Sequence, residues 1–177
     1  MRKLLVLVLF MLAAPCARAV DGVYIEGGEG NNVDMLRIGA FWKWDKTWMY
    51  GDNWQITGAW EVAAGGLRGD KPNDNNQDIS DIGITPVFHM MRVKGTGITP
   101  YVEGGFLGLH LISRAYAYND RKFGSGFQFG HHLGFGVNFG ERREYTLGYR
   151  LHHMSNGGIV QPNQGVNLNE IHFAYSF

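Results

Sequence analysis

The chain has 177 residues, of which 45% are hydrophobic and 18% are charged, and its formal net charge is zero. This even charge balance, without a basic cluster, argues against nucleic acid as a partner. The single cysteine, Cys16, lies close to the N-terminus, so the rest of the chain has neither a disulfide nor a thiolate ligand.

The first 19 residues are predicted to be a cleaved secretory signal peptide, 1–19. A short basic start, Met1 to Lys3, precedes an apolar run from Leu4 to Leu12. The small-x-small sequence from Ala17 to Ala19 follows and is typical of a cleavage site. The apolar run is too short to cross a bilayer as a helix.

A lipid anchor on Cys16 is the alternative for this segment, although the neighbouring Pro15 fits poorly in a lipidation site. Residues 20–177 are expected to form a single domain. They contain no apolar run long enough for a transmembrane helix, yet they are rich in glycine and aromatic residues. An exported chain of this composition favours an all-β fold.

Side chains alternate in size most clearly between Gly126 and Phe139. The odd positions are nearly all large and apolar, whereas the even positions are glycine or polar. A period of two indicates a β-strand. Because the second face is small rather than charged, the pattern predicts a transmembrane barrel with its apolar face toward lipid and small or polar side chains inside.

The same alternation predicts eight strands along the chain. They are 20–27, 34–44, 54–66, 79–91, 98–112, 126–139, 144–155 and 167–177. Eight strands give a barrel whose interior is just filled by side chains. We therefore expect an all-β fold, namely an eight-stranded antiparallel transmembrane β-barrel with a side-chain-filled lumen and no pore.

Connection lengths predict the orientation of the barrel. The connections 28–33, 67–78, 113–125 and 156–166 are expected on the cell exterior, and 92–97 and 140–143 are expected to be periplasmic turns. The connection from Asp45 to Asn53 is too long for a tight turn, and Trp42, Trp44, Trp48 and Trp54 cluster around it, as an aromatic girdle at a membrane interface would. The last residues, Ile171 to Phe177, alternate and end on Phe, which resembles the C-terminal signature of bacterial outer-membrane barrels.

Parity along the strand 144–155 places a histidine and a serine on the lipid-facing side. Leu147, Tyr149 and Leu151 define the outward stripe, and His153 and Ser155 continue it to the outer end of the strand. Side chains at i and i+2 share a face, so the imidazole can act as general base and the hydroxyl as nucleophile on an acyl ester. A strand that simply ends in a polar turn is the alternative.

Neighbouring residues offer the other parts of an esterase site. Asn156 and Gly158 follow the serine and can supply an amide and a backbone N–H to an oxyanion. Asn167 has the outward parity of the last strand and is the expected group to orient His153. Glu170 has the opposite parity and is the alternative if a bulge intervenes.

The segment resembles the PagL family of outer-membrane lipid A 3-O-deacylases. The resemblance is carried by a His-x-Ser-Asn-x-Gly…Gln-Pro-Asn-x-Gly motif, matched by His153, Ser155, Asn156, Gly158, Gln161, Pro162, Asn163 and Gly165. It continues through the segments Trp42 to Trp48, Pro86 to Phe88 and Pro100 to Gly105 and covers nearly all of residues 20–177.

The resemblance implies an outer-membrane esterase that removes the 3-O-linked acyl chain of lipid A, with its active site facing the outer leaflet. It implies Ser155 as nucleophile, His153 as base, Asn156 and Gly158 at the oxyanion hole, Asn163 in substrate binding and no metal cofactor. Well-known members have a glutamate where this chain has Asn167. An amide can orient the imidazole but supplies no charge, so either turnover is slower or Glu170 substitutes.

Two other functions stay open on the sequence. Outer-membrane phospholipase A has a similar His-x-Ser-Asn-Gly segment with an asparagine at similar spacing, but it is a larger barrel and uses calcium. A small structural barrel without activity is the other alternative. The short chain and the tryptophan segment favour the deacylase.

The remaining expectations concern partners and the lumen. Lipid A within lipopolysaccharide is the expected substrate, outer-membrane lipids are expected contacts, and a homodimer is left open. The doublets His131-His132 and His152-His153 put neighbours on opposite faces, so neither pair can chelate one metal ion. A polar lumen network is predicted from His132, His152, Arg37, Arg150, Glu61 and Glu103.

Overall fold

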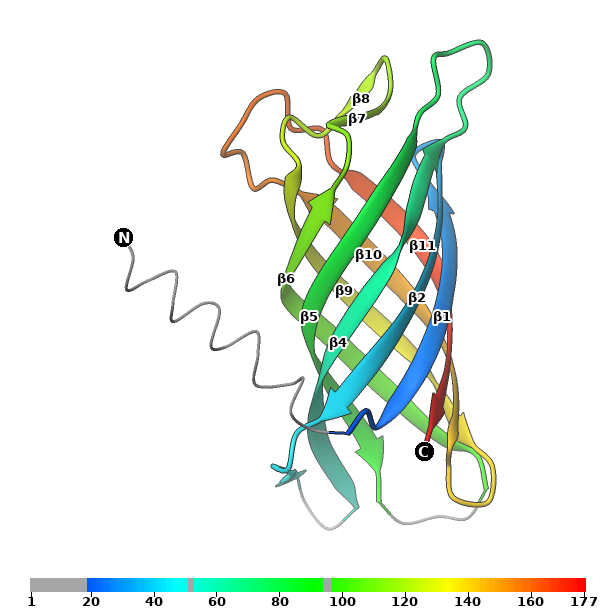
Figure 1. The fold of residues 1–177 in the computed structure, drawn as a ribbon. Coiled ribbons are helices and arrows are strands. Elements are labelled where there is room, and N and C mark those ends of the chain that lie inside the picture. The colour runs from blue at the N-terminus through cyan, green and yellow to red at the C-terminus, as the bar shows by residue number, and fades with distance from the viewer. Residues whose placement is uncertain (1–18, 51–52, 94–96) are drawn as a thin grey trace.

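Eight long strands close on themselves in the computed structural model, which describes residues 19–50, 53–93 and 97–177 (Figure 1). These strands are β1 (Gly22–Gly30), β2 (Val33–Lys43), β4 (Trp54–Gly69), β5 (Asp78–Arg92), β6 (Thr99–Ile112), β9 (Phe127–Phe139), β10 (Tyr145–Ser155) and β11 (Val166–Ser176). Each pairs antiparallel with its neighbour along the chain, and the pairing of β1 with β11 closes the barrel. The predicted all-β, eight-stranded antiparallel barrel is confirmed.

The predicted signal peptide falls almost entirely on residues 1–18, which lie outside the described residues, so the cleavage and the alternative anchor on Cys16 stay predictions. No helix among the described residues is long and apolar enough to cross a membrane.

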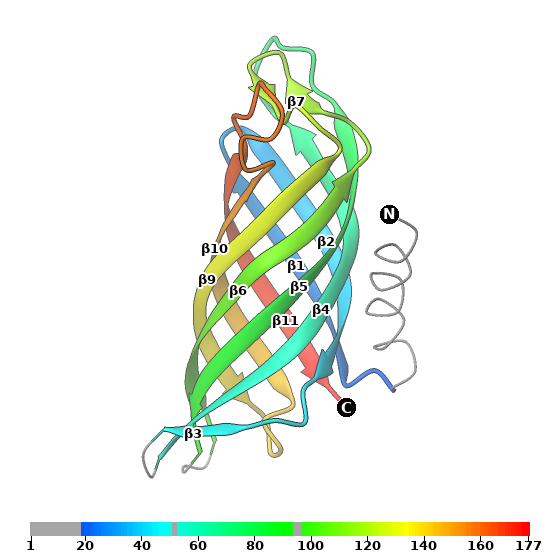
Figure 2. The same ribbon diagram turned by 90° about the vertical axis from the view of Figure 1, so that its left-hand side faces the viewer.

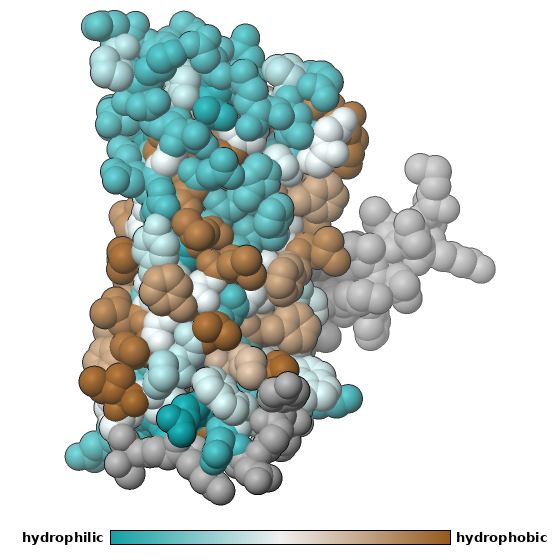
Figure 3. Space-filling view, turned by 180° about the vertical axis from the view of Figure 1, so that it is seen from behind, coloured by the Kyte–Doolittle hydropathy of each residue, from teal (hydrophilic) through white to brown (hydrophobic). Residues whose placement is uncertain are grey.

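The observed strands follow from the alternation of side chains. In β10 the even residues Arg150, His152 and Met154 are buried inside the barrel, whereas Leu147 and Leu151 are exposed on its outside. The same alternation recurs around the barrel, so apolar side chains form a belt between two hydrophilic ends (Figure 3). A belt of this kind matches the hydrocarbon region of a bilayer.

Strand β3 (Trp48–Tyr50) explains the long connection after β2. It pairs with the beginning of β4, with Trp48 opposite Ile56, so the connection extends the sheet instead of turning at once. The ring of Trp44 makes edge contacts with Trp60 and Phe88 at centroid distances of 5.9 and 4.9 Å. This aromatic cluster lies at the end of the barrel where β1 begins at Gly22 and β11 ends at Ser176 (Figure 1).

The opposite end of the barrel is covered by the connection between β6 and β9. This connection contains the small hairpin of β7 (Tyr116–Tyr118) and β8 (Arg121–Lys122), which lies above the barrel mouth (Figure 1). Phe123 and Ala117 are fully buried and pack in an apolar cluster. The other members of this cluster are Val33, Met35, Leu67, Ile79, Ile112, Tyr118, Met154, Val166 and Leu168. Sequence patterns did not predict this apolar plug beneath the loops.

Polar contacts between the loops reinforce this cover. Lys71, in the connection between β4 and β5, donates a hydrogen bond to Asp120 beside the β7–β8 hairpin. This hydrogen bond lowers the pKa of the Asp120 carboxyl and raises the pKa of the Lys71 amine. Tyr118 donates from its hydroxyl to the carbonyl of Asn31 at 2.9 Å, which ties the hairpin to the turn between β1 and β2.

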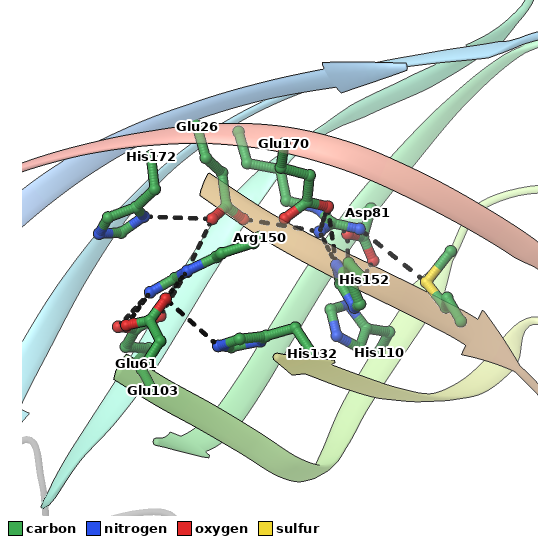
Figure 4. A network of polar contacts seen from close by, with 12 residues as sticks. Glu26, Glu61, Asp81, Glu103, His110, His132, Arg150, His152, Glu170 and His172 are labelled. Atoms are coloured by element: carbon green, nitrogen blue, oxygen red, sulfur yellow. Dashed lines mark hydrogen bonds and ion pairs between the residues drawn. The ribbon is translucent and has the colours of Figure 1, made fainter. Parts of the chain in front are cut away.

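The middle of the lumen is filled by a network of charged side chains (Figure 4). Arg150 donates to Glu26 at 2.9 Å, to Glu61 at 3.0 Å and also to Glu103. Arg37 lies 2.6 Å from Asp81. The predicted lumen network is confirmed and is larger than predicted, because Glu26, Asp81, His110, Glu170 and His172 also belong to it. Removing one partner of a buried ion pair of this kind is costly, because the other charge stays buried.

Candidate active site

Strand β10 carries His153 and Ser155 on the outer surface of the barrel, at the end nearest the loops. Their parity follows from the buried neighbours His152 and Met154, which point into the lumen. Nε2 of His153 lies 3.0 Å from Oγ of Ser155, within hydrogen-bond distance. Both side chains are half-buried. The predicted outward pair is therefore in contact, as a nucleophile and its general base require.

Asn167 on β11 completes a chain of three side chains. It is the register partner of His153, and its Oδ1 lies 2.6 Å from Nδ1 of the imidazole. An amide oxygen can only accept, so Nδ1 carries the proton and Nε2 is left to accept from the hydroxyl of Ser155. The backbone N–H of Asn167 donates to Oδ1 of Asn31 at 2.8 Å. This support from the β1–β2 turn was not predictable, because the two residues are far apart along the chain.

Glu170, the alternative orienting group, lies on the other side of the sheet. Its side chain is buried in the lumen, where Oε1 lies 2.8 Å from Nδ1 of His152. Arg37 lies 3.8 Å from the same oxygen. No bulge separates it from Asn167, because the register of β11 with β10 runs unbroken from Tyr175 to Val166. The structure therefore brings Asn167, and not Glu170, to His153.

Asn156 holds the loop that follows Ser155. Its Nδ2 donates to the carbonyl oxygens of Phe123 at 2.8 Å and Val160 at 2.7 Å, and its Oδ1 accepts from the N–H of Gly158 at 2.9 Å. The side chain is buried. The two expected oxyanion donors, Asn156 Nδ2 and Gly158 N–H, are thus both engaged in hydrogen bonds within the cover of the barrel.

Asn163 lies beside the peptide that follows the serine. Its Oδ1 accepts from the backbone N–H of Asn156 at 3.0 Å, which fixes the orientation of the amide. Within the described part of the chain, its Nδ2 has no hydrogen-bond partner, so it is a donor available to substrate. Asn163 is half-buried. The substrate-binding role expected for Asn163 stays a prediction.

Gly165 packs directly against Ser155 and His153. Its φ of 58° lies in the left-handed region, which favours glycine. A Cβ at this position would lie 2.9 Å from Cβ of Ser155 and 3.3 Å from Cε1 of His153. The last glycine of the motif is therefore needed for close approach of the loop to the site.

His131 on β9 is a neighbour that was not predicted to belong to the site. It is the register partner of His153, and the two rings lie 5.0 Å apart between centroids at an angle of 38°. The outward parity of His131 in the stripe from Phe127 to Phe139 was the signal that could have found it. Among the described residues, no group of three or more His, Cys, Asp or Glu side chains is arranged to hold a metal ion.

Comparisons with known proteins point to one family. Residues 34–176 match the family model described as Lipid A 3-O-deacylase (PagL). The chain is 31% identical over 150 residues to the lipid A deacylase PagL of Pseudomonas aeruginosa, covering 85% of this chain and 82% of that protein. It is 37% identical over 82 residues to the lipid A deacylase PagL of Bordetella bronchiseptica, covering 46% of this chain and 44% of that protein.

A solved structure is similar over the whole barrel. The crystal structure of the outer membrane enzyme PagL superimposes with a TM-score of 0.76 at 25% identity, and the match covers 88% of this chain and 99% of that one. The similarity thus covers most of this chain and nearly all of the other.

Proposed function

The chain belongs to the lipid A 3-O-deacylase (PagL) family, and we propose that it cleaves the 3-O-acyl ester of lipid A with Ser155 as nucleophile and His153 as general base. The protein is an outer-membrane β-barrel and an ester hydrolase, and lipid A is its substrate. The observation that carries the proposed mechanism is the chain of contacts from Ser155 through His153 to Asn167 on the outer surface of the barrel.

The proposed reaction begins with the attack of Ser155 Oγ on the ester carbonyl carbon, while Nε2 of His153 takes the hydroxyl proton. The tetrahedral intermediate then collapses, and His153 returns the proton to the sugar oxygen that leaves. A water molecule, activated by the same nitrogen, hydrolyses the acyl-enzyme and releases the fatty acid. Asn167 keeps the imidazole in the tautomer that this sequence needs.

Asn163 is the side-chain donor that we propose for the oxyanion. The N–H of Asn156 holds the Asn163 amide by its oxygen, which leaves Nδ2 for the negatively charged oxygen of the intermediate. The N–H of Gly158 can donate to the oxyanion only if it gives up its hydrogen bond to Oδ1 of Asn156. In this proposal Asn156 positions the loop, and Asn163 makes the contact.

The outward direction of the site fits a substrate that stays in the membrane. His153 and Ser155 lie at the loop end of β10, directly beyond the exposed apolar residues Leu147 and Leu151. We expect this boundary to lie at the depth of the ester bonds of a lipid. We place the loop end on the cell exterior, so the site faces the outer leaflet. The homodimer left open by the sequence stays a prediction.

Mass spectrometry of lipid A tests the proposed function. Cells that produce the protein are expected to contain lipid A lacking one 3-hydroxyacyl chain, and cells that produce Ser155→Ala are expected to contain the intact form. Accumulation of lysophospholipid with unchanged lipid A, or no change in either lipid class, would contradict the proposal.

A further inference from the structure

Strand β6 has one extra residue where it passes the active site. Phe106 and Leu107 lie between Gly105 and Gly108, and together they face the single residue His131 of β9. Relative to β5, on the other side, β6 also has one residue too many in this region. Such β-bulges frequently occur next to active sites, where they redirect a side chain.

The bulge places two consecutive side chains on the lipid-facing surface. Gly105 and Gly108 both occupy inward positions, so Phe106 and Leu107 are both outside, with 48% and 77% of their surfaces exposed. The φ of Leu107 is 55°, a conformation that a leucine rarely adopts. A strained backbone that projects an apolar side chain beside a functional site points to a role in that site.

The two side chains differ in direction. A Cβ at Gly104 would lie 2.6 Å from the ring of Phe106, so this ring lies over the glycine and flat against the barrel. Leu107 has no such cover and projects from the surface. The bulge therefore forms a low ridge whose crest is Leu107.

A row of side chains leads from His153, the proposed general base, to this ridge. His153 on β10 pairs with His131 on β9, and His131 faces the bulge on β6. The row crosses two strand spacings, roughly 10 Å in all. Between His153 and the ridge, the outer surface of the barrel is thus formed by the ring of His131.

The row also descends into the apolar belt. His153 lies two residues from the loop end of β10, His131 lies four from the loop end of β9, and Leu107 lies five from the loop end of β6. Figure 2 shows the corresponding tilt, with β6 below β9 and β9 below β10 on this face of the barrel. An acyl chain whose ester lies at Ser155 and that follows this row therefore enters the hydrocarbon region of the membrane.

We propose that the Phe106–Leu107 ridge seats the acyl chain whose ester is cleaved, and that Leu107 determines which acyl chains are accepted. This inference rests on the proposed function, because it takes the ester carbonyl to be at Ser155. The sugar end of the substrate lies toward the hydrophilic loops, and the acyl chain lies along His131 and against the ridge.

Selection by the ridge depends on shape. An acyl chain surrounded by lipid gains little hydrophobic free energy by moving onto an apolar protein surface, so close packing decides the preference. The rate at which an ester with a shorter acyl chain is cleaved does not depend on residue 107, because this acyl chain does not reach the ridge. A long chain must pass Leu107, so a change in the size of this side chain alters its reaction.

A competition assay with two substrates tests this inference. The purified full-length enzyme in detergent micelles is given an equal mixture of lipid A analogues that carry butyryl or 3-hydroxymyristoyl at position 3. Mass spectrometry of the products gives the ratio of kcat/KM for the two esters. Leu107→Trp is expected to lower kcat/KM for the long ester roughly tenfold and to change that for the short ester less than about twofold.

Leu107→Gly is the second variant, because glycine suits the positive φ and keeps the barrel folded. It removes the crest and is expected to lower the long-to-short ratio about threefold. Leu36→Trp and Leu36→Gly are the matched controls. Leu36 is 60% exposed on β2, three strands away from both β6 and β10, and its variants are expected to keep the wild-type ratio.

The outcomes separate this inference from the function on which it rests. Ser155→Ala is expected to lose activity on both esters, whereas the Leu107 variants are expected to lose activity mainly on the long ester. An unchanged ratio in both Leu107 variants, with the folded barrel verified by its heat-dependent electrophoretic mobility, would overturn the role of the ridge and leave the proposed function standing. An inactive wild-type enzyme would overturn both.

Discussion

Asn167 Oδ1 lies 2.6 Å from Nδ1 of His153, so an uncharged amide orients the imidazole of the proposed catalytic site. The family resemblance predicts a glutamate at this position. A carboxylate would hold the same tautomer and would also stabilise the imidazolium that forms when His153 takes the proton of Ser155. This chain has the orienting contact without the charge.

Substitution of Asn167 separates these two effects. Asn167→Ala removes the contact and is expected to lower kcat about tenfold to a hundredfold, whereas Asn167→Glu adds the charge and is expected to raise kcat severalfold. Steady-state kinetics on lipid A in detergent micelles measures both. Unchanged kcat in Asn167→Ala would show that the contact with His153 has no role in turnover.

Asn163 is predicted to stabilise the oxyanion. Its Nδ2 faces no partner within the described residues, and its Oδ1 is fixed by the N–H of Asn156. Asn163→Ala is expected to lower kcat roughly a hundredfold or more, with a small change in KM, because the contact forms mainly in the transition state. Ile159→Ala serves as the control, because Ile159 lies in the same loop with its side chain 70% exposed. An increase in KM with unchanged kcat would assign Asn163 to ground-state binding.

Gly165 is predicted to be required for the geometry of the site. In Gly165→Ala the new Cβ would lie 2.9 Å from Cβ of Ser155, so the pair must shift and kcat is expected to fall at least about tenfold. Gly97→Ala is a matched control, since Gly97 also has a positive φ, but a Cβ added there would have no atom of the described residues within 4 Å. Equal activity of both variants would show that the close approach at Gly165 is not needed.

Glu170 is predicted to act in stability and not in catalysis. Its carboxylate contacts His152 and Arg37 inside the barrel, so Glu170→Ala removes a buried carboxylate that these two side chains share. The expected cost is about 3 kcal/mol in the free energy of unfolding, measured by urea denaturation in lipid vesicles. The kcat of the folded fraction is expected to stay within about threefold of the wild type. A larger loss of kcat than in Asn167→Ala would mean that the two residues have been assigned the wrong roles.

The strands and the outward direction of the site were predictable, because both depend on the alternation of side chains between the two faces of a strand. Alternation in β10 alone predicted that His153 and Ser155 share the outer face and that Arg150 and His152 point inward. The assignment of Asn167 to the outer face came from the same rule applied to β11. These predictions needed only local sequence and an unbroken register.

Features that depend on distant contacts were not predictable. The β7–β8 hairpin covers the barrel because Phe123 packs on residues from several strands, and the bulge at Leu107 appears only when β6 is compared with β5 and β9. The engagement of Asn156 with the carbonyl of Phe123 likewise joins two loops that are distant in sequence. Single-strand patterns contain no information on such pairings.

Ser155 is proposed to carry out the hydrolysis from the outer surface of the barrel. Covalent labelling of the folded enzyme with an alkyl fluorophosphonate, followed by mass spectrometry of the tryptic peptides, tests this proposal directly. We expect a single adduct on Ser155, lost in His153→Ala, with loss of activity in proportion to labelling. An active wild-type enzyme that is not labelled, or one labelled at another residue, would contradict it.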